Sequence, residues 1–279
     1  MRMPEAVRRV DRQAWREGVT SRGARLIPEE TAIALTYNGG TYAVMMGTPL
    51  DLHDFAVGFS LSEGIVRSPG EIGSCEIVPL DEGVEVRMWL APDRAARLGE
   101  RRRHIAGPTG CGLCGIESIT EAMRRPAPVP NGQALAPDDI LAAMASLAPR
   151  QALNIETRAV HAAAFWTPGR GIVALREDVG RHNALDKLAG SLALQQVRAS
   201  EGMVLLTSRV SVEMVQKAAV MGAAMVVAVS APTALAVRMA DAAGMTLAAV
   251  ARADGFEVFT HPQRIAAPAC APETAYVVA

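Results

Sequence analysis

From residue 160 onward, apolar strands and amphipathic helices alternate along the chain, and this alternation limits the fold more than any other feature of the sequence. Helices are predicted at 181–196, 211–222 and 233–243. Strands are predicted at 160–166, 172–176, 203–207, 225–229, 246–251 and 256–260. Such alternation favours helices packed on a sheet that is at least partly parallel. The sequence therefore predicts an α/β fold whose C-terminal part is a three-layer domain.

The N-terminal part is predicted to be a smaller α+β unit. Strands at 31–37 and 41–46 flank an Asn-Gly pair, which is the strongest short signal for a hairpin. A helix is expected from Asp51 to about Gly64, followed by a strand pair at 75–79 and 84–90.

The domain limits follow from changes in composition. Residues 1–27 contain seven arginines and little periodicity, which predicts a partly ordered basic arm. Four prolines between 126 and 137 indicate a linker, and a helix is expected at 138–147. We therefore divide the chain into four parts: the arm 1–27, a small α+β domain 28–104, a cysteine-containing loop and linker 105–137, and an α/β domain 138–279.

Composition excludes some classes of partner. The formal net charge is -1, which gives no overall field to attract nucleic acid or an anionic membrane. The longest charge-free apolar window, 218–237, is interrupted by Gly222 and by a polar turn at 230–233, so no membrane-spanning helix is expected. The Arg-rich N-terminus does not resemble a secretory signal, and we expect a reducing, cytoplasmic compartment.

Two cysteines, Cys111 and Cys114, lie in the glycine-rich stretch 107–115 with the spacing C-x-x-C. Four glycines and a proline disfavour helix and strand, so we expect a loop that leaves both thiols open to a partner. A pair without function on a surface loop is one alternative. A zinc site is the main rival, but Cys75, Cys270, His104 and His161 provide no second pair of ligands.

Three junctions between a strand and a helix are unusually polar: 177–183, 207–211 and 230–233. Ligands of α/β sheets bind beyond the carboxyl ends of strands, where helix N-termini attract phosphate. Arg181 and Arg209 could add forked contacts to such a group. Each junction alone could be an ordinary N-cap, but three in succession indicate a phosphorylated or nucleotide-like ligand. His182 is a better candidate for function than His161, and neither a P-loop nor a dinucleotide fingerprint is present.

Several motifs occur along the chain: Thr48-Pro49, Asp54-Phe55-Ala56-Val57-Gly58-Phe59, Ser62-Glu63-Gly64-Ile65, Gly110-Cys111-Gly112-Leu113-Cys114-Gly115, Thr157-Arg158-Ala159-Val160-His161-Ala162-Ala163, the run 177–187 (Glu-Asp-Val-Gly-Arg-His-Asn-Ala-Leu-Asp-Lys), Ser208-Arg209-Val210-Ser211 and Glu213-Met214-Val215-Gln216-Lys217-Ala218. Together they resemble the FdhD family of formate dehydrogenase accessory sulfurtransferases. The resemblance extends from about residue 30 to 265, and the eleven-residue run is its most specific part.

The resemblance implies a sulfur carrier. A cysteine desulfurase would transfer sulfane sulfur to Cys111 as a persulfide, with Cys114 in a resolving or relay role. The carrier would pass the sulfur to the molybdenum or tungsten bis-molybdopterin guanine dinucleotide cofactor before that cofactor enters the formate dehydrogenase catalytic subunit. A guanine nucleotide such as GDP is expected to mimic the cofactor. The resemblance also implies a cytidine-deaminase-like larger domain and a homodimer.

The expected cofactor-binding residues come from a C-terminal segment that the resemblance identifies and from two of the junctions. They are Val250, Ala251, Arg252, Ala253, Asp254 and Gly255, with Arg181, His182, Ser208, Arg209 and Ser211.

The sequence also bears on three other activities. Deaminase chemistry fails, because Ala162 and Ala163 follow His161, where a zinc deaminase needs a glutamate two residues after its ligand. A thioredoxin-like reductase is disfavoured because the C-x-x-C does not open a helix after a strand. A chaperone that presents the cofactor without carrying sulfur remains the alternative.

Overall fold

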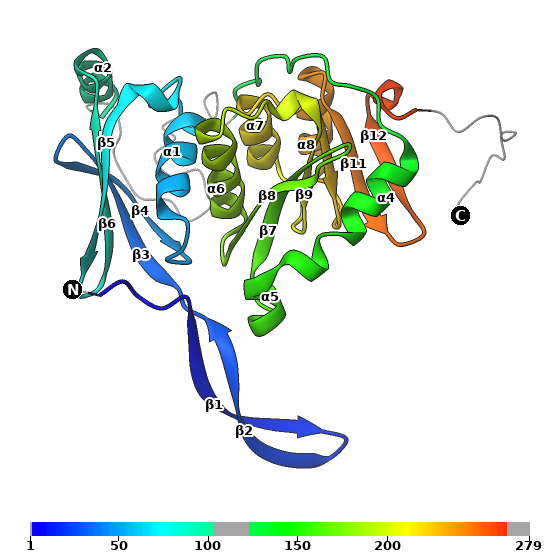
Figure 1. Ribbon diagram of the computed structural model, residues 1–279, viewed down its shortest axis with the longest axis horizontal. Helices are drawn as coiled ribbons and strands as arrows, with labels where there is room; N and C mark the ends of the chain where they lie inside the picture. Colours follow the sequence, from blue (N-terminus) through cyan, green and yellow to red (C-terminus); the bar gives the residue numbers. More distant parts are fainter. Residues whose placement is uncertain (1, 103–122, 267–279) are drawn as a thin grey trace, which may run out of the picture.

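The structure, a computed structural model, describes residues 2–102 and 123–266 of the chain (Figure 1). Within these residues the strands form a six-stranded, a four-stranded and a two-stranded sheet. No helix in the described ranges is both long and apolar enough to cross a bilayer.

The six-stranded sheet is the centre of the larger domain and has the order β12-β11-β10-β9-β7-β8. Its strands are β7 (His161–Thr167), β8 (Gly171–Asp178), β9 (Met203–Leu206), β10 (Met225–Ala228), β11 (Thr246–Arg252) and β12 (Gly255–Thr260). β9, β10 and β11 are parallel, and β7 is antiparallel to both β8 and β9. β8, β9, β10 and β11 therefore run in one direction and end at the same edge of the sheet.

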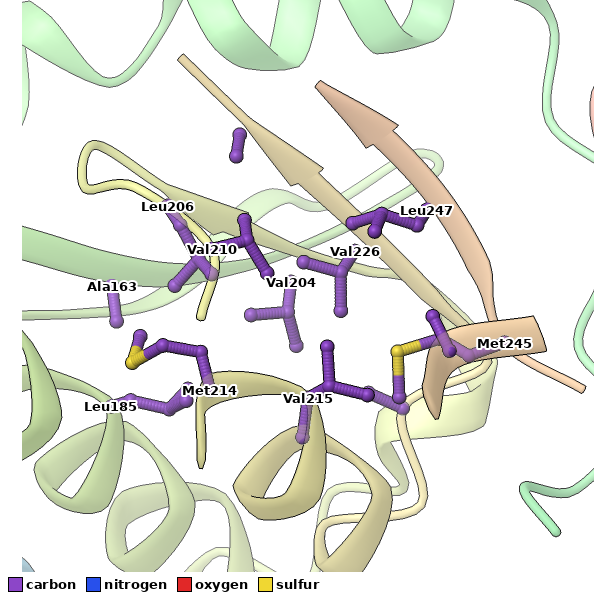
Figure 2. Close-up of a cluster of buried hydrophobic side chains, with 14 of the residues drawn as sticks. Ala163, Leu185, Val204, Leu206, Val210, Met214, Val215, Val226, Met245 and Leu247 are labelled. Carbon is purple, nitrogen blue, oxygen red and sulfur yellow. The ribbon is translucent and has the colours of Figure 1, made fainter. Parts of the chain in front are cut away.

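Helices cover both faces of this sheet, as predicted. α6 (Arg181–Leu194), α7 (Val212–Val220) and α8 (Ala234–Ala242) pack on one face, and α4 (Pro137–Ala145) packs on the other. Successive strand residues alternate between the two cores: Val204 faces α7, whereas Leu205 faces α4. Figure 2 shows the first core, in which Val204 and Val226 of the sheet lie opposite Val215 of α7. The three-layer arrangement is thus confirmed.

The smaller domain is a four-stranded sheet of order β4-β3-β6-β5 with a helix on one face. Its elements are β3 (Thr31–Tyr37), β4 (Gly40–Gly47), α1 (Leu52–Ser62), β5 (Ile72–Leu80), β6 (Gly83–Leu90) and α2 (Pro92–Arg102). Asn38 and Gly39 both have positive φ, at 48° and 79°, which fits a type I′ turn and confirms the predicted hairpin.

The two domains meet where α1 crosses α6. A Cβ atom at Gly58 would lie 1.7 Å from the carbonyl oxygen of Asp186, and one at Gly190 would lie 1.9 Å from that of Asp54. Only glycine permits this approach, so the helices pack backbone to backbone.

The N-terminal arm, predicted as partly ordered over residues 1–27, forms a long hairpin over residues 7–28 instead. β1 (Val7–Arg16) pairs with β2 (Val19–Pro28) along its full length. Glu17 and Gly18 take positive φ values of 51° and 78° and close the turn. Two further helices were not predicted, α2 and α5 (Ala152–Thr157). Short 3-10 turns lie at η1 (Pro69–Glu71), η2 (Ala148–Arg150), η3 (Ala199–Glu201) and η4 (Pro262–Arg264).

Candidate functional site

The three polar junctions and the segment 250–255 lie at the sheet edge where β8, β9, β10 and β11 end. They share this edge because these four strands run in the same direction. The edge from β8 to β11 spans four inter-strand intervals, or about 19 Å at ~4.8 Å per interval.

Backbone hydrogen bonds tie the loops of this edge together. Thr207 donates its N–H to the carbonyl of Ala162 (3.1 Å), and its hydroxyl accepts from the N–H of Ala162 (2.8 Å). Thr233 N–H donates to the carbonyl of Val210 (2.9 Å). The loops after β9 and β10 are thus held in register with the start of β7.

The three helices that begin at this edge differ in how their N-termini are capped. Thr233 caps α8, because its hydroxyl accepts from the N–H of Ala236 (3.2 Å). The third junction is therefore an ordinary N-cap. α6 begins after Gly180 and α7 after Ser211, and neither has a side-chain cap among the described residues. Uncapped N–H groups and the helix dipole make these two ends suited to an anion.

Buried polar atoms without hydrogen-bond partners concentrate at the same two helix ends. Of seven such atoms in the described part of the chain, four are Arg181 Nε, His182 Nε2, Ser211 Oγ and Glu213 Oε2. Buried polar groups are normally satisfied, so a cluster of exceptions calls for an explanation such as a bound polar group. This cluster is the strongest structural sign of a ligand site.

The two histidines at this edge are uncharged at neutral pH. Burial, followed by the charges of Arg181 and Lys217, lowers the pKa of His182 to about 4. Burial and Arg181 also lower the pKa of His161. Positive charge at the edge is therefore supplied by arginines, including the exposed Arg209, and the imidazoles can act as neutral hydrogen-bonding groups.

Much of the eleven-residue run 177–187 anchors the small domain. Lys187 Nζ lies 2.7 Å from Asp178 Oδ2, both fully buried, and donates to the carbonyl of Thr48 (2.9 Å). Asp178 also accepts from the Thr48 N–H (3.0 Å), and Asn183 Nδ2 donates to the carbonyl of Met46 (2.9 Å). Asp178, Asn183 and Lys187 of this motif thus join the two domains, whereas Arg181 and His182 belong to the candidate site.

Lys217 is a buried cation in the motif 213–218 that was not among the predicted site residues. Its Nζ donates to both carboxylate oxygens of Asp186 (2.9 and 2.8 Å) and to Ser62 Oγ (2.9 Å). Burial alone would lower the pKa of Lys217, but Asp186 and Glu63 raise it above its ordinary value. The sequence indicates this buried cation only by placing a single lysine within the largely apolar helix predicted at 211–222.

The segment 250–255 forms the end of β11 and the turn into β12. The side chain of Ala251 is in the core, and Arg252 Nη1 donates to the carbonyls of Val229 (2.5 Å) and Ala251 (2.8 Å). Ala253 and Asp254 form the turn, which Gly255 closes. Val250 has a φ of 53°, rare for a β-branched residue, at an irregularity in the β11–β12 pairing.

Ser208 also has a local contact, since its hydroxyl donates to the carbonyl of Arg209 (3.1 Å). The side chains of Ser208 and Arg252 thus make hydrogen bonds within this edge, and that of Ala251 packs in the core. Cofactor binding by the residues named from the sequence stays a prediction.

Cys111 and Cys114 lie outside the described residues. The chain re-enters the described part beside α7, where Gln216 Nε2 donates to the carbonyl of Arg124 (3.0 Å). Burial raises the pKa of Cys75, a half-buried thiol in β5, to about 11, so it is not a thiolate at neutral pH. Within the described residues, no group of three or more His, Cys, Asp or Glu side chains could hold a metal ion.

The fold and the edge define a two-domain α/β protein with a candidate anion-binding site at the carboxyl ends of its parallel strands. Comparison with known proteins narrows this class. The model of the FdhD/NarQ family matches residues 28–266. The chain belongs to the FdhD/NarQ family.

The similarity to individual relatives covers nearly the whole chain. The Sulfur carrier protein FdhD of Agrobacterium fabrum is 52% identical over 262 residues, which cover 92% of this chain and 96% of the relative. That of Cupriavidus necator is 51% identical over 252 residues, 90% of this chain and 87% of the relative. A crystal structure from Desulfotalea psychrophila, of a protein described as a formate dehydrogenase accessory protein, superposes with a TM-score of 0.75 at 26% identity and covers 94% of this chain and all of that one.

Proposed function

We propose that this protein is a sulfur carrier that accepts sulfane sulfur on Cys111 and delivers it to the bis-molybdopterin guanine dinucleotide cofactor of a formate dehydrogenase. Family membership supports the coarse role, because the relatives are named sulfur carrier proteins. The observation that carries the finer proposal is the cluster of unpartnered polar atoms at two uncapped helix N-termini, in a chain that also contains a glycine-framed C-x-x-C.

Loading is a thiol exchange. The Cys111 thiolate attacks the outer sulfur of the persulfide on a cysteine desulfurase, and the bond from that sulfur to the desulfurase cysteine breaks. The desulfurase cysteine leaves as a thiolate, and Cys111 carries the persulfide. Glycine neighbours favour this exchange because they leave the sulfur open to a second protein.

Release needs an electron pair, which Cys114 can supply. Its thiolate attacks the inner sulfur, Cys111 Sγ, so that sulfide leaves and a Cys111–Cys114 disulfide forms. A dithiol reductant then restores both thiols. Sulfide is thus delivered at the reduction level of a metal–sulfur ligand without an oxidant.

The cofactor is the substrate of this transfer and is expected to bind at the sheet edge. The diphosphates would bind at the N-termini of α6 and α7 near Arg181, Arg209 and Ser211, and GDP would mimic one end. Cys114 precedes Arg124 by ten residues, a segment that can span up to about 35 Å and so can reach along the edge. The proposal includes a cytidine-deaminase-like larger domain, a cytoplasmic location and a homodimer.

The experiment is to incubate the protein with a cysteine desulfurase and L-cysteine and to analyse it by mass spectrometry without reductant. We expect the mass of one sulfur atom on the peptide that contains Cys111. Cys111→Ala should abolish this gain and the activation of formate dehydrogenase. Cys75→Ala is the matched control and should retain both, because its buried thiol has a raised pKa.

A chaperone that only presents the cofactor is the second candidate, favoured by the same ligand edge. It would gain no sulfur, and its Cys111→Ala variant would still activate the dehydrogenase. That result would remove Cys111 from the mechanism.

A further inference from the structure

Glu213 does not fit a site that binds phosphate alone. It is the second residue of α7 (Val212–Val220), so its side chain lies in the first turn of a helix to whose N-terminus the proposed function assigns a phosphate. A carboxylate accepts hydrogen bonds but cannot donate them, and its charge repels a phosphate. The position of this glutamate therefore needs an explanation that an anion by itself does not provide.

The usual role of an acidic residue in the first turn of a helix does not account for Glu213. Such a residue stabilises the helix through its dipole while its carboxylate stays hydrated at the surface. Glu213 Oε2 is instead buried, and no donor in the described part of the chain reaches it. A buried carboxylate oxygen without a donor is costly, so the arrangement points to a donor that is supplied by a ligand.

The cation one turn further along α7 does not supply that donor. The charge of Glu213 contributes to the raised pKa of Lys217, so the two side chains lie close enough to interact. A lysine ammonium has three N–H donors, and those of Lys217 are directed to both carboxylate oxygens of Asp186 and to Ser62 Oγ. Glu213 is therefore left as an acceptor within a site that otherwise attracts anions.

The unpartnered atoms at the two helix ends together describe the ligand. Arg181 Nε can only donate and Glu213 Oε2 can only accept, whereas His182 Nε2 and Ser211 Oγ can act in either role. A ligand that satisfies all four must combine an anionic acceptor with a hydroxyl or N–H donor close to it. A diphosphate bridge that is ionised on both phosphates has no such donor, so another part of the ligand must provide it.

In a nucleotide, the ribose is the group best placed to provide the donor. A single carbon joins it to the 5′ phosphate, whereas the base lies on the far side of the sugar. Its 2′ and 3′ hydroxyls are adjacent and can both donate to one carboxylate, and an acidic side chain binds the ribose in the same way in dinucleotide-binding folds. The first-turn position of Glu213 suits a ribose that lies next to a phosphate at the N-terminus of α7.

We propose that Glu213 selects ribonucleotides at this edge by accepting hydrogen bonds from the 2′ and 3′ hydroxyls of a ribose whose phosphate lies at the N-termini of α6 and α7. This inference rests on the proposed function and deepens it, because it names a part of the guanine nucleotide that the site recognises besides the phosphates. Arg181 and the helix ends attract the phosphates, and Glu213 discriminates against anions that bring no hydroxyl.

Isothermal titration calorimetry of the full-length protein with GDP and with 2′,3′-dideoxy-GDP tests the inference. The wild type should bind GDP roughly 10- to 100-fold more tightly, which is the range for hydrogen bonds to a charged group. Glu213→Met keeps the length of the side chain and removes both acceptors, so the preference should fall below about 3-fold. This variant should bind 2′,3′-dideoxy-GDP at least as tightly as the wild type does, because a charge that repels the diphosphate is gone.

Glu201→Met is the matched control. Glu201 precedes β9 at the opposite edge of the sheet, and it is exposed and pairs with the exposed Arg198. Its replacement removes the same charge and should leave the preference for GDP at the wild-type value. Glu213→Gln retains one of the two acceptors, so its preference should lie between those of the wild type and Glu213→Met.

An unchanged preference for GDP in Glu213→Met would overturn the inference, as would equal binding of the two nucleotides by the wild type. Inosine diphosphate lacks only the 2-amino group of the base. If the wild type prefers GDP over inosine diphosphate and Glu213→Met abolishes that preference, Glu213 binds the base, and the inference is also wrong. In these three cases GDP still binds, so the proposed function survives.

Absence of GDP binding by the wild type would remove the nucleotide-binding edge from the proposed function together with this inference. The gain of sulfur on Cys111 is measured separately, so the carrier role stands or fails on that experiment.

Discussion

At the scale of single residues, the buried titratable groups around the sheet edge differ in the charge of their neighbours. Lys187 and Lys217 are buried with carboxylates within 3 Å and form ion pairs. His182 is buried near Arg181 and Lys217, and its pKa falls to about 4. The sequence predicted His182 as a site residue from its polar neighbours. It could not predict that Asp178 and Lys187 also hydrogen-bond the backbone of Thr48, because Thr48 lies more than a hundred positions away.

The depressed pKa of His182 makes stability depend on pH. The unfolded imidazole titrates near its ordinary value of 6.5 and the folded one near 4, so the unfolded state binds more protons between these values. Stability is therefore complete above pH 6.5 and falls as the pH drops, by roughly 2 to 3 kcal/mol at pH 4.5. Urea unfolding at pH 7 and 4.5 should show a smaller loss for His182→Asn than for the wild type. Equal losses of unfolding free energy in the two proteins would mean that His182 does not cause the pH dependence. His161, whose pKa is also lowered, would then be the next group to test.

At the scale of secondary-structure elements, the sequence predicted what is packed and missed what is exposed. Strands β3 to β12 and helices α1, α4, α6, α7 and α8 all contribute to a core, and their apolar periodicity revealed them. β1 and β2 have no core of their own, so arginines replace the apolar alternation that identifies strands. The two helices that were not predicted have little apolar periodicity to identify them. α2 contains Gly99 and has one buried leucine, Leu98, and α5 has only six residues.

The crossing of α1 and α6 was also invisible in the sequence, because nothing local marks Gly58 as a contact. Gly58→Ala places a methyl group 1.7 Å from the Asp186 carbonyl oxygen, which forces the helices apart. We expect a loss of roughly 3 kcal/mol or more in the free energy of unfolding, at the upper end of overpacking effects. Gly70→Ala is the control, since a Cβ there has no neighbour within 4 Å. Equal stability of the two variants in urea unfolding would contradict the backbone-to-backbone packing.

At the scale of the whole molecule, the two domains are joined by buried charge as well as by helix packing. Asp178 and Lys187 of the larger domain bind the backbone of Thr48, which follows β4 of the smaller one. Lys217 and Asp186 bind Ser62 at the end of α1. The small domain is therefore held against the end of β8 and the middle of α6, and it also contacts α7 through Lys217.

Loss of one of these cations should uncouple the domains. Lys187→Met leaves Asp178 buried without its counter-charge, and we expect a loss of about 3 to 5 kcal/mol. Trp89 in β6 and Trp166 in β7 report on the small and large domains. With the third tryptophan, Trp15, replaced by Phe, a Trp166→Phe background follows the small domain and a Trp89→Phe background follows the large one. The wild type should unfold with one midpoint, and Lys187→Met with two, the smaller domain first because its core is smaller. Arg198→Met, which removes an exposed pair with Glu201, should change little. Coincident midpoints in Lys187→Met would show that helix packing alone couples the domains.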